Sequence, residues 1–310
     1  MRLGGQFSTG DGKVQVTLPE VSTAFLEHRP RLNPHYLEAR AKSEDWLIRS
    51  CGFDDRISRI IRQTDFSFFC AIVIPDVDLD GLRLLCDWGN FIFPLDDSFD
   101  CGDLKTNPEE AQNLVDGLIT VMNDGRYEPN DPLLIAFKSI WLRFSLSSSK
   151  AIQGRFISRS AYELELPDTV IQDPGIRTLE KIATEIIVIQ NDIMSYCKES
   201  DLGESYNLVS LFYQQGVPTQ PSFECVGDML GERHRRWNKV LKKLPTWGEE
   251  IDRQVGKYIG GIRNVVTANN NWSHWTERYW GGMGSEERRP RTIKVTVEVA
   301  APPLSNEEMR

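Results

Sequence analysis

The residues best suited to chemistry in this chain are acidic side chains at the end of an apolar helical stretch. The sequence FPLDDSFD places Asp96 beside Asp97, with Asp100 four residues after Asp96. Because residues four apart share a helical face, Asp96 and Asp100 are expected to point the same way. Hard oxygen ligands of this kind suit Mg²⁺, which prefers substrate phosphate. The pattern predicts a magnesium site, and a solvated acidic helix end is the alternative for so short a motif.

A second set of oxygen-bearing side chains lies in NDIMSYCKE. Asn191, Ser195 and Glu199 follow at intervals of four, so a helix would place all three on one face. Lys198 stands beside that stripe, where its ammonium group can meet a phosphate as a point charge. A solvated helix end is again the alternative. The two motifs together favour a site for metal and phosphate.

A third motif, WSHWTERYW, contains Arg278 followed by Tyr279. Arginine offers a bidentate fork for phosphate oxygens, and tyrosine adds a hydroxyl donor. The dipeptide alone carries little information. Its place at the end of the helical part of the chain gives it weight beside the other two motifs.

The elements that carry these motifs are predicted to be helices, because apolar residues recur with helical spacing. The predicted ranges are 36–50, 54–70, 80–93, 108–123, 133–145, 175–197 and 223–241. We therefore expect an all-α domain over residues 1–280. Residues 281–310 are rich in Gly, Pro and charge, and we predict a disordered tail, because the alternating run from Ile293 to Val299 has no visible partner strand.

Composition excludes several classes of protein. With 36 Lys and Arg against 45 Asp and Glu, the net charge of -9 argues against nucleic acid as a partner. The longest apolar run, Phe66 to Ile74, is far short of the ~20 residues that a membrane span requires. No signal peptide is visible, and the cysteines lack CxxC spacing. We expect a soluble cytoplasmic protein, and the sequence does not predict its oligomeric state.

The chain resembles fungal (basidiomycete-type) class I terpene synthases of the sesquiterpene type, over most of its length. The resemblance is carried by RLNPHYLEARAKSEDWL, CDWGNFIFPLDDSFD, NDIMSYCKE and WSHWTERY. It implies a class I terpenoid synthase helical bundle around an apolar cavity, an isoprenyl diphosphate substrate and three Mg²⁺ ions.

The resemblance also implies a role for each motif. The implied metal ligands are Asp96 with Asp100 for two ions, and Asn191, Ser195 and Glu199 for the third. Asp97 matches an acidic position that need not touch metal. The side chains implied to contact the diphosphate are Lys198, Arg278 and Tyr279. Aromatic faces stabilise cations, and the candidates, for which plain core packing is the alternative, are Phe66, Phe69, Phe93 and Trp272.

The stretch between the two metal motifs is shorter than in the family. Only 90 residues separate Asp100 from Asn191. Two family-like segments join near 156–160, where roughly two helices are lacking, including one with an arginine that senses the diphosphate. The nearest arginines, Arg143, Arg155 and Arg159, do not match that sensor. We expect an internal deletion at this point.

The prediction is a Mg²⁺-dependent terpene synthase. It would ionise farnesyl diphosphate, or geranyl diphosphate, and cyclise or quench the carbocation. The main alternative is a catalytically inactive truncated paralogue or splice form that at most binds Mg²⁺-diphosphate. A chain-elongating prenyltransferase is a further alternative, although Asn191 to Glu199 fits poorly as its second aspartate-rich motif. The sequence does not predict the product.

Overall fold

The computed structural model describes residues 13–19, 30–100, 102–147, 166–201, 203, 206–280 and 292–296. Within these residues the regular secondary structure is helical apart from one pair of strands, which confirms the all-α class. The first half contains α1 (Tyr36–Cys51), α2 (Asp55–Thr64), α3 (Phe66–Val73), α4 (Leu79–Asp100), a short 3₁₀ helix η2 (Asp103–Thr106), α5 (Pro108–Asn123) and α6 (Pro132–Ser147). The second half contains α8 (Asp168–Ile171), α9 (Pro174–Asp201), α10 (Leu208–Gln214), α11 (Thr219–Leu241), α12 (Glu249–Trp275) and α13 (Glu277–Trp280).

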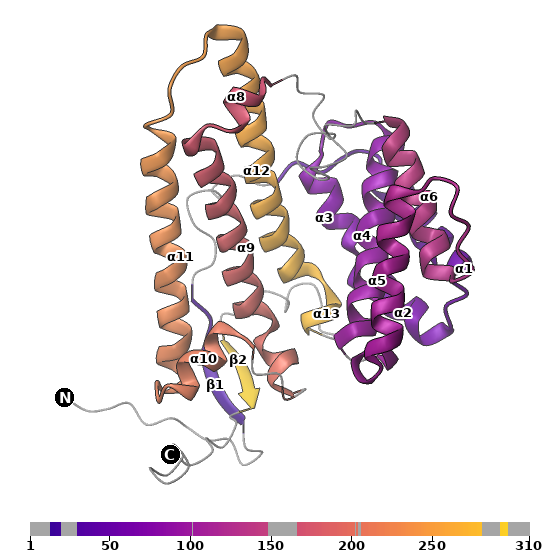
Figure 1. Cartoon of the computed structure of the whole chain (residues 1–310). Helices are drawn as coiled ribbons and strands as arrows, with labels where there is room; N and C mark the ends of the chain where they lie inside the picture. The colour runs from indigo at the N-terminus through magenta and orange to yellow at the C-terminus, as the bar shows by residue number, and fades with distance from the viewer. Residues whose placement is uncertain are drawn as a thin grey trace, which may run out of the picture.

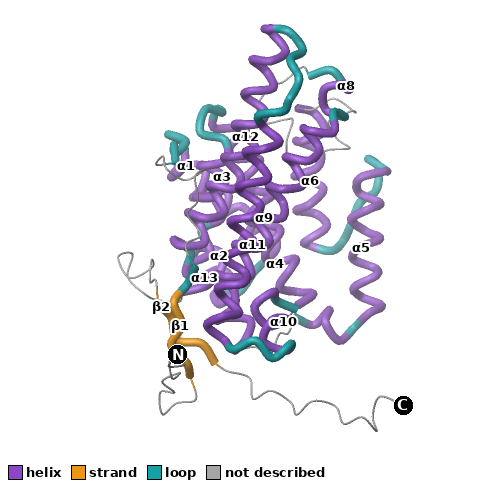
Figure 2. The backbone as a smooth tube through the Cα atoms, turned by 90° about the vertical axis from the view of Figure 1, so that its left-hand side faces the viewer, coloured by secondary structure: helices purple, strands orange, loops and turns teal. Residues whose placement is uncertain are grey.

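Helix α12 joins the two halves of the molecule. In Figure 1 it stands between α9 and α11 on one side and the group formed by α1, α3, α4, α5 and α6 on the other. It contacts α3 in the first half and α9 in the second, and the same helices lie together in Figure 2. Its buried Ala268 packs with α3 residues, whereas Val266 packs with α9 residues. None of the described helices combines the length and apolar character that a membrane span requires.

The prediction of one helix over 54–70 is wrong in one respect, because the helix is interrupted at Asp65. Helix α2 ends at Thr64 and α3 begins at Phe66. Asp65 has a φ of 45°, in the left-handed region. Aspartate tolerates this region better than most residues, but a sequence pattern does not reveal where it is used. The break turns α3 toward α12.

Two further helices differ from prediction. Helix α4 does not end at Phe93 but continues through Pro94 to Asp100, so the aspartate motif is helical. None of the predicted ranges covers α12, although apolar residues recur through it at helical spacing. The glycines within it, which lower helix propensity, obscured that pattern.

The strands β1 (Lys13–Thr17) and β2 (Thr292–Thr296) pair antiparallel, with Val14 opposite Val295 and Val16 opposite Ile293. All four side chains belong to the hydrophobic core around α9. The predicted disorder is therefore wrong for 292–296, because the partner strand lies near the other end of the sequence. The rest of 281–310 and the expected deletion near 156–160 lie outside the described residues.

Candidate functional site

The three motifs converge at α13. Arg278 donates two hydrogen bonds to Asp97 at the end of α4, with Nη1–Oδ2 and Nη2–Oδ1 distances of 3.1 and 2.8 Å. The neighbouring Tyr279 hydroxyl accepts a hydrogen bond of 2.8 Å from Asn191 Nδ2 on α9. The Arg278–Tyr279 pair thus bridges the aspartate motif and the second motif. Lys198 of α9 lines the same cavity as Asp97 and Arg278.

Charges at this junction act on one another. Burial is the main cause that raises the pKa of Tyr279 to about 12. The carboxylates of Glu199 and Asp96 act in the same direction, and the charge of Arg278 and the hydrogen bond from Asn191 oppose them. Tyr279 is therefore protonated near neutral pH. Since its oxygen accepts from Asn191, its own hydrogen is free to point at a ligand. Burial alone would lower the pKa of Arg278, but the hydrogen bonds and charge of Asp97 outweigh it, so the pKa is raised.

The α9 motif presents three different oxygen atoms. Ser195 is 2% exposed, and its Oγ has no hydrogen-bond partner in the structure. Glu199 Oε2 accepts a hydrogen bond of 2.9 Å from Asn207 Nδ2. Buried polar atoms are normally paired, so an unpaired hydroxyl within one face of Asn, Ser and Glu suits a hard cation as the missing partner. In the part of the chain that the structure describes, no group of three or more His, Cys, Asp or Glu side chains could hold a metal.

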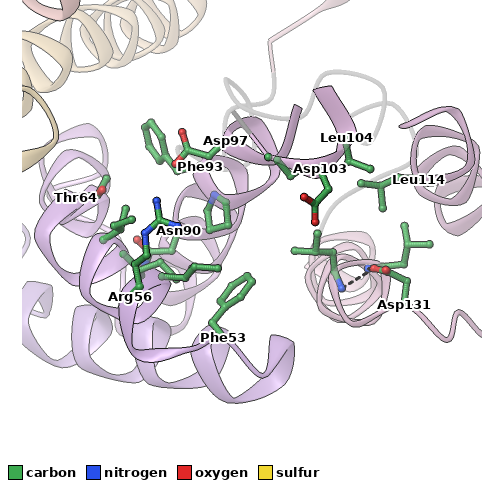
Figure 3. Close-up of a pocket in the computed structure, with 18 of the residues that line it drawn as sticks. Phe53, Arg56, Thr64, Asn90, Phe93, Asp97, Asp103, Leu104, Leu114 and Asp131 are labelled. Carbon is green, nitrogen blue, oxygen red and sulfur yellow. Dashed lines mark hydrogen bonds between the residues drawn. The ribbon is translucent and has the colours of Figure 1, made fainter. Parts of the chain in front are cut away.

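A cavity of about 1110 Å³ opens beside the aspartate motif. Figure 3 shows Phe93 and Asp97 of α4 at one end, Phe53 and Arg56 on the α2 side, and Leu104, Leu114 and Asp131 on the opposite side. Apolar and charged side chains both line it. This volume is slightly above the usual range for small-molecule sites, whose upper limit is about 1,000 Å³.

The four aromatic candidates form one cluster. The Phe66 ring lies 4.4 Å from Phe69, 4.9 Å from Phe93 and 5.2 Å from Trp272, between centroids. Among the described residues of this cluster, only Phe93 lines the cavity. Arg278 Cζ stands 4.8 Å from the Phe93 centroid. The aromatic cluster, which includes residues of α3 and α12, therefore lies next to Arg278 through Phe93.

Comparison with known proteins agrees with this geometry. A family model described as terpene synthase family 2, C-terminal metal binding, matches residues 158–236. The chain is 29% identical to terpene cyclase 4 of Gibberella fujikuroi and 28% identical to the silphinene synthase PeniA of Penicillium patulum, with 90% of each chain covered in both cases. The chain is similar to fungal terpene synthases over most of its length. Among solved structures it is similar to the germacradien-4-ol synthase of Streptomyces citricolor, with a TM-score of 0.69 and 19% identity, covering 82% of this chain and 98% of that one. That similarity supports the fold.

This similarity indicates a terpene synthase, and the matched family model implies a divalent metal and a prenyl diphosphate substrate. Asp96 is exposed at the end of α4. Asp100 is the last residue of α4, and its side chain lies outside the described residues. Arg143 is bound to Asp87, at 2.7 Å from Nη1 to Oδ2, and so is held away from the site. Arg155 and Arg159 lie outside the described residues.

Sequence reasoning missed Asn207, the N-cap of α10. Its Nδ2 donates to Glu199 Oε2 and, at 2.8 Å, to the carbonyl of Asp192, while its Oδ1 accepts from the Val209 amide. It is 1% exposed. An asparagine just before an apolar stretch signals a helix cap, but its contact with Glu199 depends on the turn between α9 and α10.

Replacing Asn207 with alanine is expected to raise the Mg²⁺ concentration needed for half-maximal activity about tenfold, because partners of metal ligands fix their orientation. Activity titrated with Mg²⁺ measures this. The matched control is Asn123→Ala, which removes an amide that bonds the Ile119 carbonyl on exposed α5. An Mg²⁺ dependence equal in both variants would contradict the role of Asn207.

Proposed function

We propose that this synthase converts farnesyl diphosphate, with Mg²⁺, to a sesquiterpene, and that it acts in the cytoplasm. The observation that carries the proposal is the convergence of Asp97, Arg278, Tyr279 and Asn191 from three separate motifs. There the Arg278 guanidinium and the protonated Tyr279 hydroxyl lie between the aspartate motif of α4 and the second motif of α9. That combination suits a metal-bound diphosphate.

In this proposal the metal ligands are Asp96 with Asp100, and Asn191, Ser195 and Glu199. Bound Mg²⁺ ions, three by family resemblance, would neutralise the charge that develops on diphosphate when its bond to carbon breaks. Arg278 donates to the diphosphate as well, after exchanging or sharing its hydrogen bonds with Asp97. Tyr279 donates through its free hydrogen, and Lys198 adds a point charge.

The aromatic cluster supports the second part of the reaction. A carbocation left after diphosphate departs is stabilised by ring faces, and Phe93 and Trp272 lie next to the diphosphate end of the site. Water must be excluded from the site, because it would react with the carbocation.

An inactive paralogue is the second candidate, and one observation favours it. The alignment with terpene cyclase 4 runs over 328 positions, although this chain has 310 residues. The alignment therefore includes positions of the relative that this chain lacks. That fits the expected deletion between the metal motifs.

The proposal is tested by incubating the purified chain with farnesyl diphosphate and Mg²⁺ and identifying volatile products by gas chromatography–mass spectrometry. A terpene that disappears with Asn191→Ala is expected. Thermal unfolding with Mg²⁺ and pyrophosphate separates the alternatives. Stabilisation without any product from farnesyl or geranyl diphosphate would favour the inactive paralogue, because binding to the native state stabilises it without chemistry.

A further inference from the structure

The break between α2 and α3 is the point where the end of α12 is fixed. The Thr64 carbonyl accepts two hydrogen bonds, one of 2.8 Å from Trp272 Nε1 and one of 2.9 Å from Thr276 Oγ1. Asp65 Oδ2 accepts a third, of 3.2 Å, from Trp275 Nε1. A continuous helix would use the Thr64 carbonyl within its own backbone ladder. The break frees it for α12.

Thr276 carries this attachment on to the arginine. Its hydroxyl donates to the Thr64 carbonyl and accepts, at 3.1 Å, from the backbone N–H of Arg278. Thr276 is fully buried, so water does not replace either bond. The same hydroxyl therefore caps the start of α13 and links α13 to the end of α2. Helix α13 contacts both α2 and α9.

The break is itself strongly held. Asp65 is, within the described residues, the one non-glycine residue with positive φ. Its carboxylate accepts from the Tyr36 hydroxyl at 2.6 Å and pairs with Arg40 at 2.8 Å. Arg40 in turn donates to the buried Glu44 at 2.9 Å. Strained backbone persists where surrounding contacts over-determine it, and such places cluster at functional sites.

We propose that Thr276, seated on the Thr64–Asp65 break, is a positioning residue that sets where Arg278 and Tyr279 present their donors to the diphosphate. The inference rests on the proposed function for its ligand, but the positioning itself is a property of the free protein. The same break starts α3 at Phe66, whose ring contacts Phe93 and Trp272. One backbone feature thus aligns the diphosphate donors with the aromatic cluster.

The test compares Thr276→Val, which keeps the shape and removes the hydroxyl, with Thr276→Ser, which restores it. The control is Thr178→Val, which removes a hydroxyl bonded to the Pro174 carbonyl in the first turn of α9, at the opposite end of that helix from the motif. Hydrogen exchange of the peptide containing Arg278 is measured without ligand. Pyrophosphate affinity with Mg²⁺ is measured by calorimetry on the unsubstituted chain and on the same three variants.

In Thr276→Val, exchange at α13 is expected to rise, and pyrophosphate affinity to fall, each about tenfold, because a buried N–H loses its acceptor. Serine and the control should match the unsubstituted chain. Unchanged α13 exchange in the valine variant, or equal changes in Thr178→Val, overturns the inference. If the unsubstituted chain binds no pyrophosphate, the proposed function fails, and the exchange data alone decide the positioning role.

Discussion

Replacing Arg278 with methionine is expected to lower kcat/KM for farnesyl diphosphate by about 10³-fold, because a buried donor aimed at developing charge is removed. The Arg278 side chain is 10% exposed, so its interaction with the leaving group is weakly screened. Lysine should restore part of the activity at most, since an ammonium lacks the bidentate fork. Product formation over a range of substrate concentrations measures both variants.

The matched control for this prediction is Arg143→Met. Arg143 is likewise ion-paired, although its side chain is 39% exposed. Its partner is Asp87, which keeps a second partner in Arg83 at 2.7 Å. Loss of Arg143 should change kcat/KM less than about threefold, on the order of other substitutions remote from the reacting groups. Loss of product with Arg143→Met, and its retention with Arg278→Met, would reverse the assignment of the two arginines.

Ser195→Ala is expected to separate activity from stability. The Ser195 hydroxyl is buried with no partner in the free protein, so its removal should raise the free energy of unfolding by about 1 kcal/mol. Activity should nevertheless fall by about 10²-fold at fixed Mg²⁺, as expected when a metal ligand is lost. Urea unfolding and an Mg²⁺ titration of product formation measure the two effects.

Ser273→Ala provides the comparison within the same chain. Ser273 of α12 is likewise fully buried, and its Oγ likewise has no hydrogen-bond partner. A similar gain in stability is expected there, with unchanged Mg²⁺ dependence. If Ser195→Ala gains stability and keeps the Mg²⁺ dependence of the unsubstituted chain, Ser195 is not a metal ligand.

Local signals predicted most helices well. Asn107 followed by Pro108 marks the start of α5, and the predicted range 108–123 is the one found, because a cap and an N1 proline act within a few residues. Helical spacing alone placed Asn191, Ser195 and Glu199 on α9. Features that depend only on residues nearby in the chain can therefore be predicted from the sequence.

Features that depend on distant partners cannot. The break at Asp65 is held by Tyr36, Arg40 and Trp275, and nothing in the sequence around Asp65 reveals those contacts. Asn207 is a helix cap by sequence, and its bond to Glu199 forms only when α10 folds back beside α9. The motifs can therefore be found from the sequence, whereas the residues that position them are defined by the fold.

A ribosome releases β1 long before β2 has been synthesised. Until Thr292–Thr296 emerges, Val14 and Val16 have no strand to pair with, and such non-local pairings form slowly. The unpaired strand is a template for association with other chains. An expression design that stops after Trp280, as the predicted tail would suggest, removes β2 for good. Yield of monomeric protein should depend on keeping the last strand.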